Sequence, residues 1–75
     1  MTFDPEQCAV AVAALTPRQK EILRLIAEGM TSKEIAGQLG ISTRTEEKHR
    51  ELIYFKLQIR SSTEATRFCL TAKMV

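Results

Sequence analysis

Apolar residues recur along this 75-residue chain at the spacing of short amphipathic helices, with turn residues between them. The pattern is clearest over residues 31–50, TSKEIAGQLGISTRTEEKHR. One side of its first helix carries an apolar stripe at i, i+1 and i+4, namely Ile35, Ala36 and Leu39. Gly40 ends that helix because glycine adopts a left-handed conformation at little cost, and Ser42 is a natural N-cap for a second helix. The small Ala36 lets the two helices cross closely, so this stretch predicts a helix-turn-helix.

Three other stretches predict helices of the same kind. An Asp-Pro start begins a short helix over about residues 5–14, and a Thr-Pro start begins another that closes at Gly29. A capping box over residues 61–64 begins the last helix. The apolar faces expected for these helices are Cys8, Ala11, Val12 and Leu15; Ile22, Leu23, Ile26 and Met30; and Ala65, Phe68, Cys69 and Ala72. With a helix expected over about residues 43–57, the pattern predicts an all-α fold.

The composition is that of one ordinary small globular domain, with 44% hydrophobic and 27% charged residues. The longest apolar run, residues 8–15, is too short to span a bilayer, and the basic start of a secretory signal is missing. We therefore expect a cytoplasmic protein without a membrane partner. Cys8 and Cys69 show neither CxxC spacing nor a histidine cluster, which favours free thiols over a metal site. Because no phosphate-cradling loop and no activated nucleophile is present, we expect no enzyme, no cofactor and no small-molecule ligand.

The net charge of +2 supports nucleic-acid binding only weakly, but its distribution is informative. Residues 42–60 hold five basic residues against three acidic ones, which equals the net charge of the whole chain. The basic residues are Arg44, Lys48, Arg50, Lys56 and Arg60. A solvated amphipathic helix could show the same balance.

The chain also resembles a known family. From Leu15 to Ala72, the order LTPRQKEILRLIAEGMTSKEIAGQLGIS, then RT, KH, IYFKL and RSSTEA, is similar to the DNA-binding domain of LuxR-type transcription factors, also called the GerE or FixJ/NarL type. The resemblance implies a four-helix domain that binds double-stranded DNA as a homodimer. Its third helix would lie in the major groove, and its last helix would form the dimer contact.

On this basis the chain divides into two parts. Residues 15–75 form the LuxR-type domain, with the helix-turn-helix at 31–50 and the dimerisation helix at 62–74. Residues 1–14 are either an extra helix that covers the domain or a partner, or the tail of a linker from a larger regulator. Met1 slightly favours a free-standing protein.

Two groups of residues are candidates for DNA contact. The first is the start of the helix at Thr31, where unsatisfied N–H groups and the positive end of the helix dipole suit a phosphate, although the capping box alone would explain Thr31. The second is the helix over residues 43–57, whose outward side would face the groove. There Glu47, Lys48 and Glu51 are the expected base readers, because lysine donates to guanine and a carboxylate accepts from cytosine. For the two glutamates, simple solvation is an equally good explanation.

Phosphate contacts are expected from Arg44, Thr45, Arg50 and Lys56, and Arg60 could add to them. The complete set of predicted DNA-binding residues is Thr31, Ser32, Lys33, Thr43, Arg44, Thr45, Glu47, Lys48, Arg50, Glu51 and Lys56.

Glu46 departs from the family pattern, which has an apolar residue, usually valine, at this place. On a helical wheel Glu46 points toward the helix crossing, where an unpaired carboxylate is costly. One alternative is that the helix begins one residue late and Glu46 folds back in a capping box with Thr43. Another is that Glu46 meets a basic partner such as Arg18 or Lys33. A third is that the two helices cross less closely than in relatives. We expect Glu46→Val to raise the melting temperature, unless the carboxylate is well satisfied. His49 lies on the same core-facing side, so we expect it to be structural.

The last helix leaves apolar residues on its far side, which suits a two-fold dimer contact, although scattered surface apolarity would look the same. The predicted dimer residues are Leu70, Met74 and Val75. The sequence thus predicts a sequence-specific, dimeric transcription regulator. The alternative is a protein-interaction module that dimerises with a larger regulator and binds DNA poorly, as Glu46 and the low net charge would allow.

Overall fold

A computed structural model describes residues 4–72 and shows only helices in that range, which confirms the all-α prediction. The five helices are α1 (Pro5–Ala13), α2 (Pro17–Ala27), α3 (Ser32–Leu39), α4 (Thr43–Leu57) and α5 (Ser62–Thr71). The helix expected over residues 43–57 has the predicted bounds, and the extra N-terminal helix is present and one residue shorter than expected. None of the described helices is long and apolar enough to cross a bilayer.

Side-chain caps fix where the helices begin. Reciprocal capping boxes start α2, between Thr16 and Gln19, and α3, between Thr31 and Glu34. The box predicted for α5 forms only in part. The Ser61 hydroxyl accepts from the Glu64 N–H, but the Glu64 carboxylate accepts from the N–H of Arg60 instead of that of Ser61.

Left-handed residues end three of the helices. Gly29 has φ 89° after α2, and Gly40 has φ 69° after α3, as the positions of the two glycines predicted. The third is Gln58 at the end of α4, with φ 57°. A left-handed residue with a side chain is uncommon and costs conformational free energy that a glycine would not.

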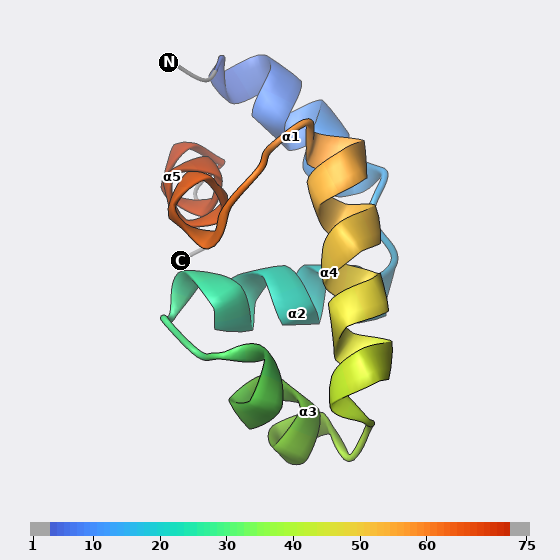
Figure 1. Cartoon of the computed structure of the whole chain (residues 1–75). Helices are drawn as coiled ribbons and strands as arrows, with labels where there is room; N and C mark the ends of the chain where they lie inside the picture. Colours follow the sequence, from blue (N-terminus) through green and yellow to red (C-terminus); the bar gives the residue numbers. More distant parts are fainter. Residues whose placement is uncertain (1–3, 73–75) are drawn as a thin grey trace.

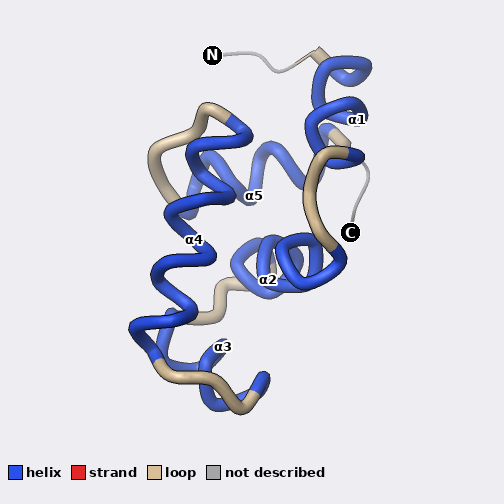
Figure 2. The backbone as a smooth tube through the Cα atoms, turned by 90° about the vertical axis from the view of Figure 1, so that its right-hand side faces the viewer, coloured by secondary structure: helices blue, strands red, loops and turns tan. Residues whose placement is uncertain are grey.

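The core forms where α2 crosses the middle of the molecule (Figure 1). One side of α2 packs on α5, while α4 runs along its end and continues down to α3. Ile22, Leu23 and Ile53 are completely or almost completely buried at these contacts. A view turned by 90° shows that α4 extends from the end of the molecule that holds α3 toward the end that holds α1 (Figure 2). The helix-turn-helix therefore stands at one end of a frame built by α2 and α5.

The first helix packs on this frame as well. Cys8 is 2% exposed and belongs to the core, and α1 contacts α4 and α5. Both cysteines are free and buried. Burial raises the pKa of the Cys69 thiol to about 11, with the nearby Arg24 acting weakly in the opposite direction. This thiol therefore stays protonated at neutral pH and serves as a small core residue.

Candidate nucleic-acid interface

The helix-turn-helix closes through the backbone of its turn. The Ile41 N–H donates to the Ala36 carbonyl over 3.0 Å, and the left-handed Gly40 makes this bond possible. Ala36 is 3% exposed, so a small residue occupies the crossing of α3 and α4, as the sequence predicted. Ser42 then caps α4, because its hydroxyl accepts from the Thr45 N–H. This arrangement fixes the direction in which α4 leaves the turn.

The outward side of α4 carries exposed polar side chains along its first three turns. Arg44, Glu47, Lys48 and Glu51 are all exposed, and so are Thr43 and Thr45 at the start of the helix. The predicted base readers Glu47, Lys48 and Glu51 thus share one accessible surface with Arg44, and we call this surface the α4 outer face. Its lysine and glutamates can donate to and accept from base edges.

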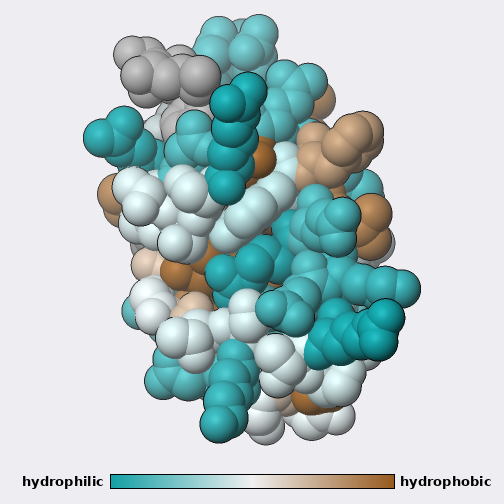
Figure 3. Space-filling view, in the orientation of Figure 1, coloured by the Kyte–Doolittle hydropathy of each residue, from teal (hydrophilic) through white to brown (hydrophobic). Residues whose placement is uncertain are grey.

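The α4 outer face changes character toward its C-terminal half. Leu52 is 52% exposed and Phe55 is 82% exposed, and together with Lys48 and Glu51 they line a surface hollow. Hydrophobic atoms stand out among hydrophilic ones at the edge of the molecule formed by α4 (Figure 3). No role was predicted from the sequence for Phe55 or for Leu52. Their exposure is the only signal that marks them.

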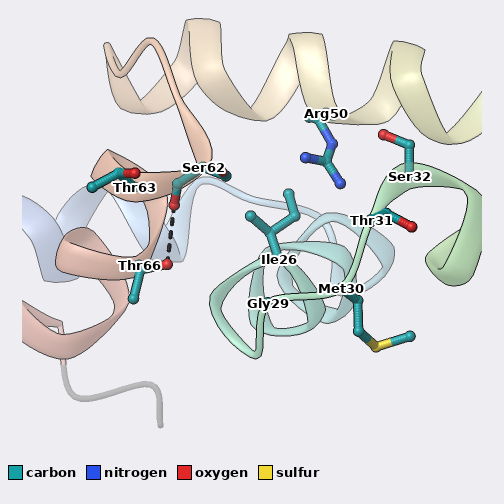
Figure 4. Close-up of a pocket in the computed structure, with 9 residues that line it drawn as sticks. All are labelled: Ile26, Gly29, Met30, Thr31, Ser32, Arg50, Ser62, Thr63 and Thr66. Carbon is teal, nitrogen blue, oxygen red and sulfur yellow. Dashed lines mark hydrogen bonds between the residues drawn. The ribbon is translucent and has the colours of Figure 1, made fainter.

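A second polar surface lies at the start of α3. Thr31, Ser32 and Arg50 line a pocket of about 400 Å³, together with the first residues of α5. The close-up shows that the Arg50 side chain points from α4 into the space between the start of α3 and Ser62 (Figure 4). Three of the predicted DNA-contact residues from two helices are therefore neighbours. Lys33 is exposed beside them but does not line the pocket.

The start of α3 is held rigidly. The Glu34 carboxylate accepts from the Thr31 backbone N–H over 2.9 Å, and the Thr31 hydroxyl accepts from the Glu34 N–H over 3.2 Å. These bonds from the backbone and side chain of Thr31 lower the pKa of Glu34 below its ordinary value. Glu34 therefore keeps a negative charge next to the predicted phosphate contact, which weakens the attraction for a phosphate there.

Among residues 4–72, Glu46 is the one charged residue that is buried, and its partner is not one that the sequence analysis suggested. Its side chain is 0% exposed, and Oε1 accepts from Nε of Arg50 over 3.1 Å. Arg18 and Lys33 were expected from the sequence as examples of a basic partner. Both are wrong, because Arg50, four positions along the same helix, is nearer. The capping box with Thr43 is wrong too, since α4 begins at Thr43 and is capped by Ser42.

This pairing limits what Arg50 can do for DNA. Its side chain is only 18% exposed, and one edge of the guanidinium faces Glu46. Oε2 of Glu46 and Nη2 of Arg50 are both buried and have no hydrogen-bond partner among the described residues. Nε and Nη2 lie on the same edge of a guanidinium, so a small rotation would complete a two-bond pair. Arg50 therefore lies beside the other predicted phosphate contacts, but its guanidinium is paired with Glu46 inside the domain.

Lys56 also has a partner within the domain. Its Nζ donates over 3.0 Å to Oε1 of Gln19, which also accepts from the Thr16 N–H in the α2 capping box. Gln19 is 5% exposed. The Thr-Pro start predicted where this helix begins, but it did not predict a contact between Gln19 and another helix. Its second bond, from a lysine 37 residues away, ties the start of α2 to the end of α4.

The remaining predicted residues are placed as follows. His49 is half-buried, and Arg60 is exposed. Leu70 is 62% exposed on α5, which suits a contact surface, whereas Met74 and Val75 lie outside the described residues. Over residues 4–72, no three His, Cys, Asp or Glu side chains gather closely enough to hold a metal ion.

Comparison with known proteins identifies the domain. The model of the family "Bacterial regulatory proteins, luxR family" matches residues 13–69, which cover α2, α3, α4 and most of α5. The response regulatory protein YgeK of Escherichia coli (strain K12) is 48% identical over 56 residues, or 75% of this chain and 38% of YgeK. The transcriptional regulatory protein MctR of Rhizobium johnstonii is 45% identical over 56 residues, 75% of this chain and 26% of MctR.

A third relative is the oxygen regulatory protein NreC of Staphylococcus carnosus (strain TM300), which is 41% identical over 61 residues, 81% of this chain and 28% of NreC. The chain thus spans less than half the length of each of these three relatives. Their shared part is the LuxR-type DNA-binding domain, and the family model covers most of the fold described above. The chain belongs to the luxR family of bacterial regulatory proteins.

Proposed function

We propose that this chain binds duplex DNA sequence-specifically as a cytoplasmic dimer and regulates transcription. The observation that carries the proposal is the α4 outer face, where Arg44, Glu47, Lys48 and Glu51 are exposed on one side of a helix whose other side is fixed in the core. A helix of this kind fits a major groove and presents its first turns to the base edges.

In this proposal the contacts divide by chemistry. Lys48 donates to guanine, and Glu47 and Glu51 accept from cytosine amino groups, which gives sequence preference. Arg44, Thr43 and Thr45 contact one strand, while Thr31, Ser32 and Lys33 hold the other through the start of α3. Lys56 and Arg50 contribute less than a fully exposed cation would, because each already has a partner inside the domain.

The dimer would form through α5. Leu70 supports this step, because a leucine that is 62% exposed on the last helix offers apolar surface to a second copy. Met74 and Val75 extend the same predicted contact. A dimer reads two half-sites, and their spacing follows from the distance between the two α4 helices.

The test is a titration of labelled duplex DNA with the purified chain at two salt concentrations, with the oligomeric state recorded by sedimentation. DNA binding by a dimer should weaken steeply as salt rises, because bound phosphates release counterions. A folded dimer that binds no duplex would refute the proposal. That result would favour an interaction module that pairs with a larger regulator, a role for which Glu47 and Glu51 on the outer face give some reason.

A further inference from the structure

The hollow on α4 formed by Lys48, Glu51, Leu52 and Phe55 combines two kinds of chemistry in one place. Two of its side chains are charged and are proposed to read bases. The other two are apolar and strongly exposed, at 52% for Leu52 and 82% for Phe55. Exposed apolar side chains that lie together on a DNA-reading helix indicate a binding partner with an apolar surface of its own.

The position of Phe55 relative to Lys48 indicates what that partner is. The two residues are seven positions apart, so they lie on the same side of the helix and about 10 Å apart along its axis. In the proposed complex α4 follows the groove, so Phe55, two helical turns farther from the α3–α4 turn, faces base pairs beyond the one that Lys48 contacts. The same helix face thus reaches a neighbouring part of the groove.

The major groove offers one apolar group, which is the C5 methyl group of thymine. Phenylalanine is one of the side chains that contact it. Because Leu52 and Phe55 line the hollow together with Lys48, a methyl group that enters it would contact both apolar side chains and the aliphatic part of Lys48. We propose that Leu52 and Phe55 read thymine methyl groups at the end of the half-site away from the α3–α4 turn. The proposal rests on the DNA-binding function proposed above.

A protein partner fits this patch less well. A stable protein interface buries about 800 Å² on each side. An aromatic side chain supplies roughly 150–250 Å², so Leu52 and Phe55 fall well short of that area. Charged residues on the same face would also lose their hydration in a protein contact. A small apolar group in a groove that is otherwise polar matches the hollow better.

The test replaces thymine by deoxyuridine, which removes only the methyl group. A preferred duplex is first obtained by selection with the wild-type chain, and each thymine in it is then replaced in turn. We expect about a fourfold loss of affinity at one or two positions, the value of one buried methyl group. Phe55→Ala and Leu52→Ala should bind the original duplex more weakly and should be insensitive to the same replacements. Val10→Ala is the matched control, because Val10 is 72% exposed on α1.

The outcomes separate this proposal from the function on which it rests. Sequence-specific binding that is unaffected by deoxyuridine, or affected equally in the wild type and in Phe55→Ala, would overturn the methyl contact while leaving the proposed function intact. Full DNA affinity in Phe55→Ala together with reduced self-association would show that the hollow is a protein contact instead. Failure of the wild-type chain to prefer any duplex would refute both proposals.

Discussion

Glu46 and Arg50 form an ion pair on a single helix, Nε to Oε1 at 3.1 Å, in which the carboxylate is completely buried and the guanidinium lines an open pocket. The two partners therefore differ in how they would respond to losing each other. Arg50 can turn toward the pocket and reach water, whereas Glu46 cannot reach water without unfolding part of the helix crossing.

This asymmetry predicts unequal effects of single substitutions. Arg50→Leu should destabilise the domain by about 3–5 kcal/mol, because it leaves the Glu46 carboxylate buried and unpaired. Glu46→Val should destabilise it less, since Arg50 can become hydrated. From the sequence alone, Glu46→Val was expected to raise the melting temperature. Because Arg50 pairs with Glu46, we now expect this substitution to lower it. Urea denaturation followed by circular dichroism measures both.

The double variant Glu46→Val with Arg50→Leu should regain most or all of the stability, because replacing both charges by apolar residues is often neutral or stabilising by about 1–4 kcal/mol. A double variant whose loss equals the sum of the two single losses would mean that the pair is not coupled.

Gln58 offers a stabilising substitution. Its φ of 57° is left-handed, so Gln58→Gly should stabilise the domain by about 0.5–1 kcal/mol after allowing for the greater freedom of glycine in the unfolded chain. Thermal unfolding should show a rise of several degrees. Gln58→Ala is the control, since it removes the side chain but keeps the unfavourable conformation. Equal melting temperatures for the two variants would contradict this explanation.

Cys69 predicts how stability changes at alkaline pH. Its pKa is raised to about 11 from 9.0, so between these values the native thiol keeps its proton while the unfolded thiol loses it. The contribution of Cys69 to the free energy of unfolding is complete below pH 9. It is lost as the pH rises toward 11, and at pH 10 the free energy of unfolding is lower by about 1 kcal/mol. Urea midpoints at pH 8 and pH 10 measure this, and the decline should be smaller in Cys69→Ser, which cannot titrate there. The same decline in both proteins would assign it to other groups.

Lys48 and Arg44 should differ in the kind of DNA defect they cause. Lys48→Ala should relax the preference at one base pair by about 1–3 kcal/mol, whereas Arg44→Ala should weaken all duplexes alike and lower the salt slope by about one. Lys56 is a poorer phosphate probe than Arg44, because Lys56→Ala also removes the bond to Gln19. Titrations with matched and mismatched duplexes distinguish the two effects. Equal, small effects of both substitutions would remove these site assignments.

Leu70 should control self-association. Leu70→Asp places a charge on the predicted α5 contact and should shift the chain to monomer by sedimentation, while the far-UV circular dichroism spectrum stays that of a folded helical domain because Leu70 is 62% exposed in the single chain. Val10→Asp, at an even more exposed position on α1, should leave the oligomeric state unchanged. A dimer that persists in Leu70→Asp would place the contact elsewhere.

Local chemistry explains how much of the fold could be predicted. The bounds of α4 follow from Ser42 at its start and from the end of its apolar pattern, and the capping box between Thr31 and Glu34 fixes the start of α3. These signals act within four residues, so the sequence displays them directly. The resemblance to LuxR-type domains added the order of the helices.

The unpredicted features depend on side-chain direction and on distant partners. Arg50 was expected to point toward DNA; its i, i+4 spacing from Glu46 allows an ion pair, but the burial of Glu46 and the direction of the Arg50 side chain decide that this pair forms. The bond from Lys56 to Gln19 joins residues 37 positions apart, which no local pattern reveals. Of the candidate site, the sequence predicted which residues are exposed on α4, but it gave no reason to single out Leu52 and Phe55.

The bond between Lys56 and Gln19 has a consequence for how binding preference can change. It helps hold α4 at a fixed rotation about its own axis, and the residues that α4 buries, Glu46, Ile53 and Leu57, lie on the side away from Glu47, Lys48 and Glu51. The three exposed side chains can therefore be exchanged without altering the angle at which the helix is presented. The positions proposed to read bases are thus different from those that hold α4 in the fold, so substitutions at Glu47, Lys48 and Glu51 alone could give this domain new base preferences.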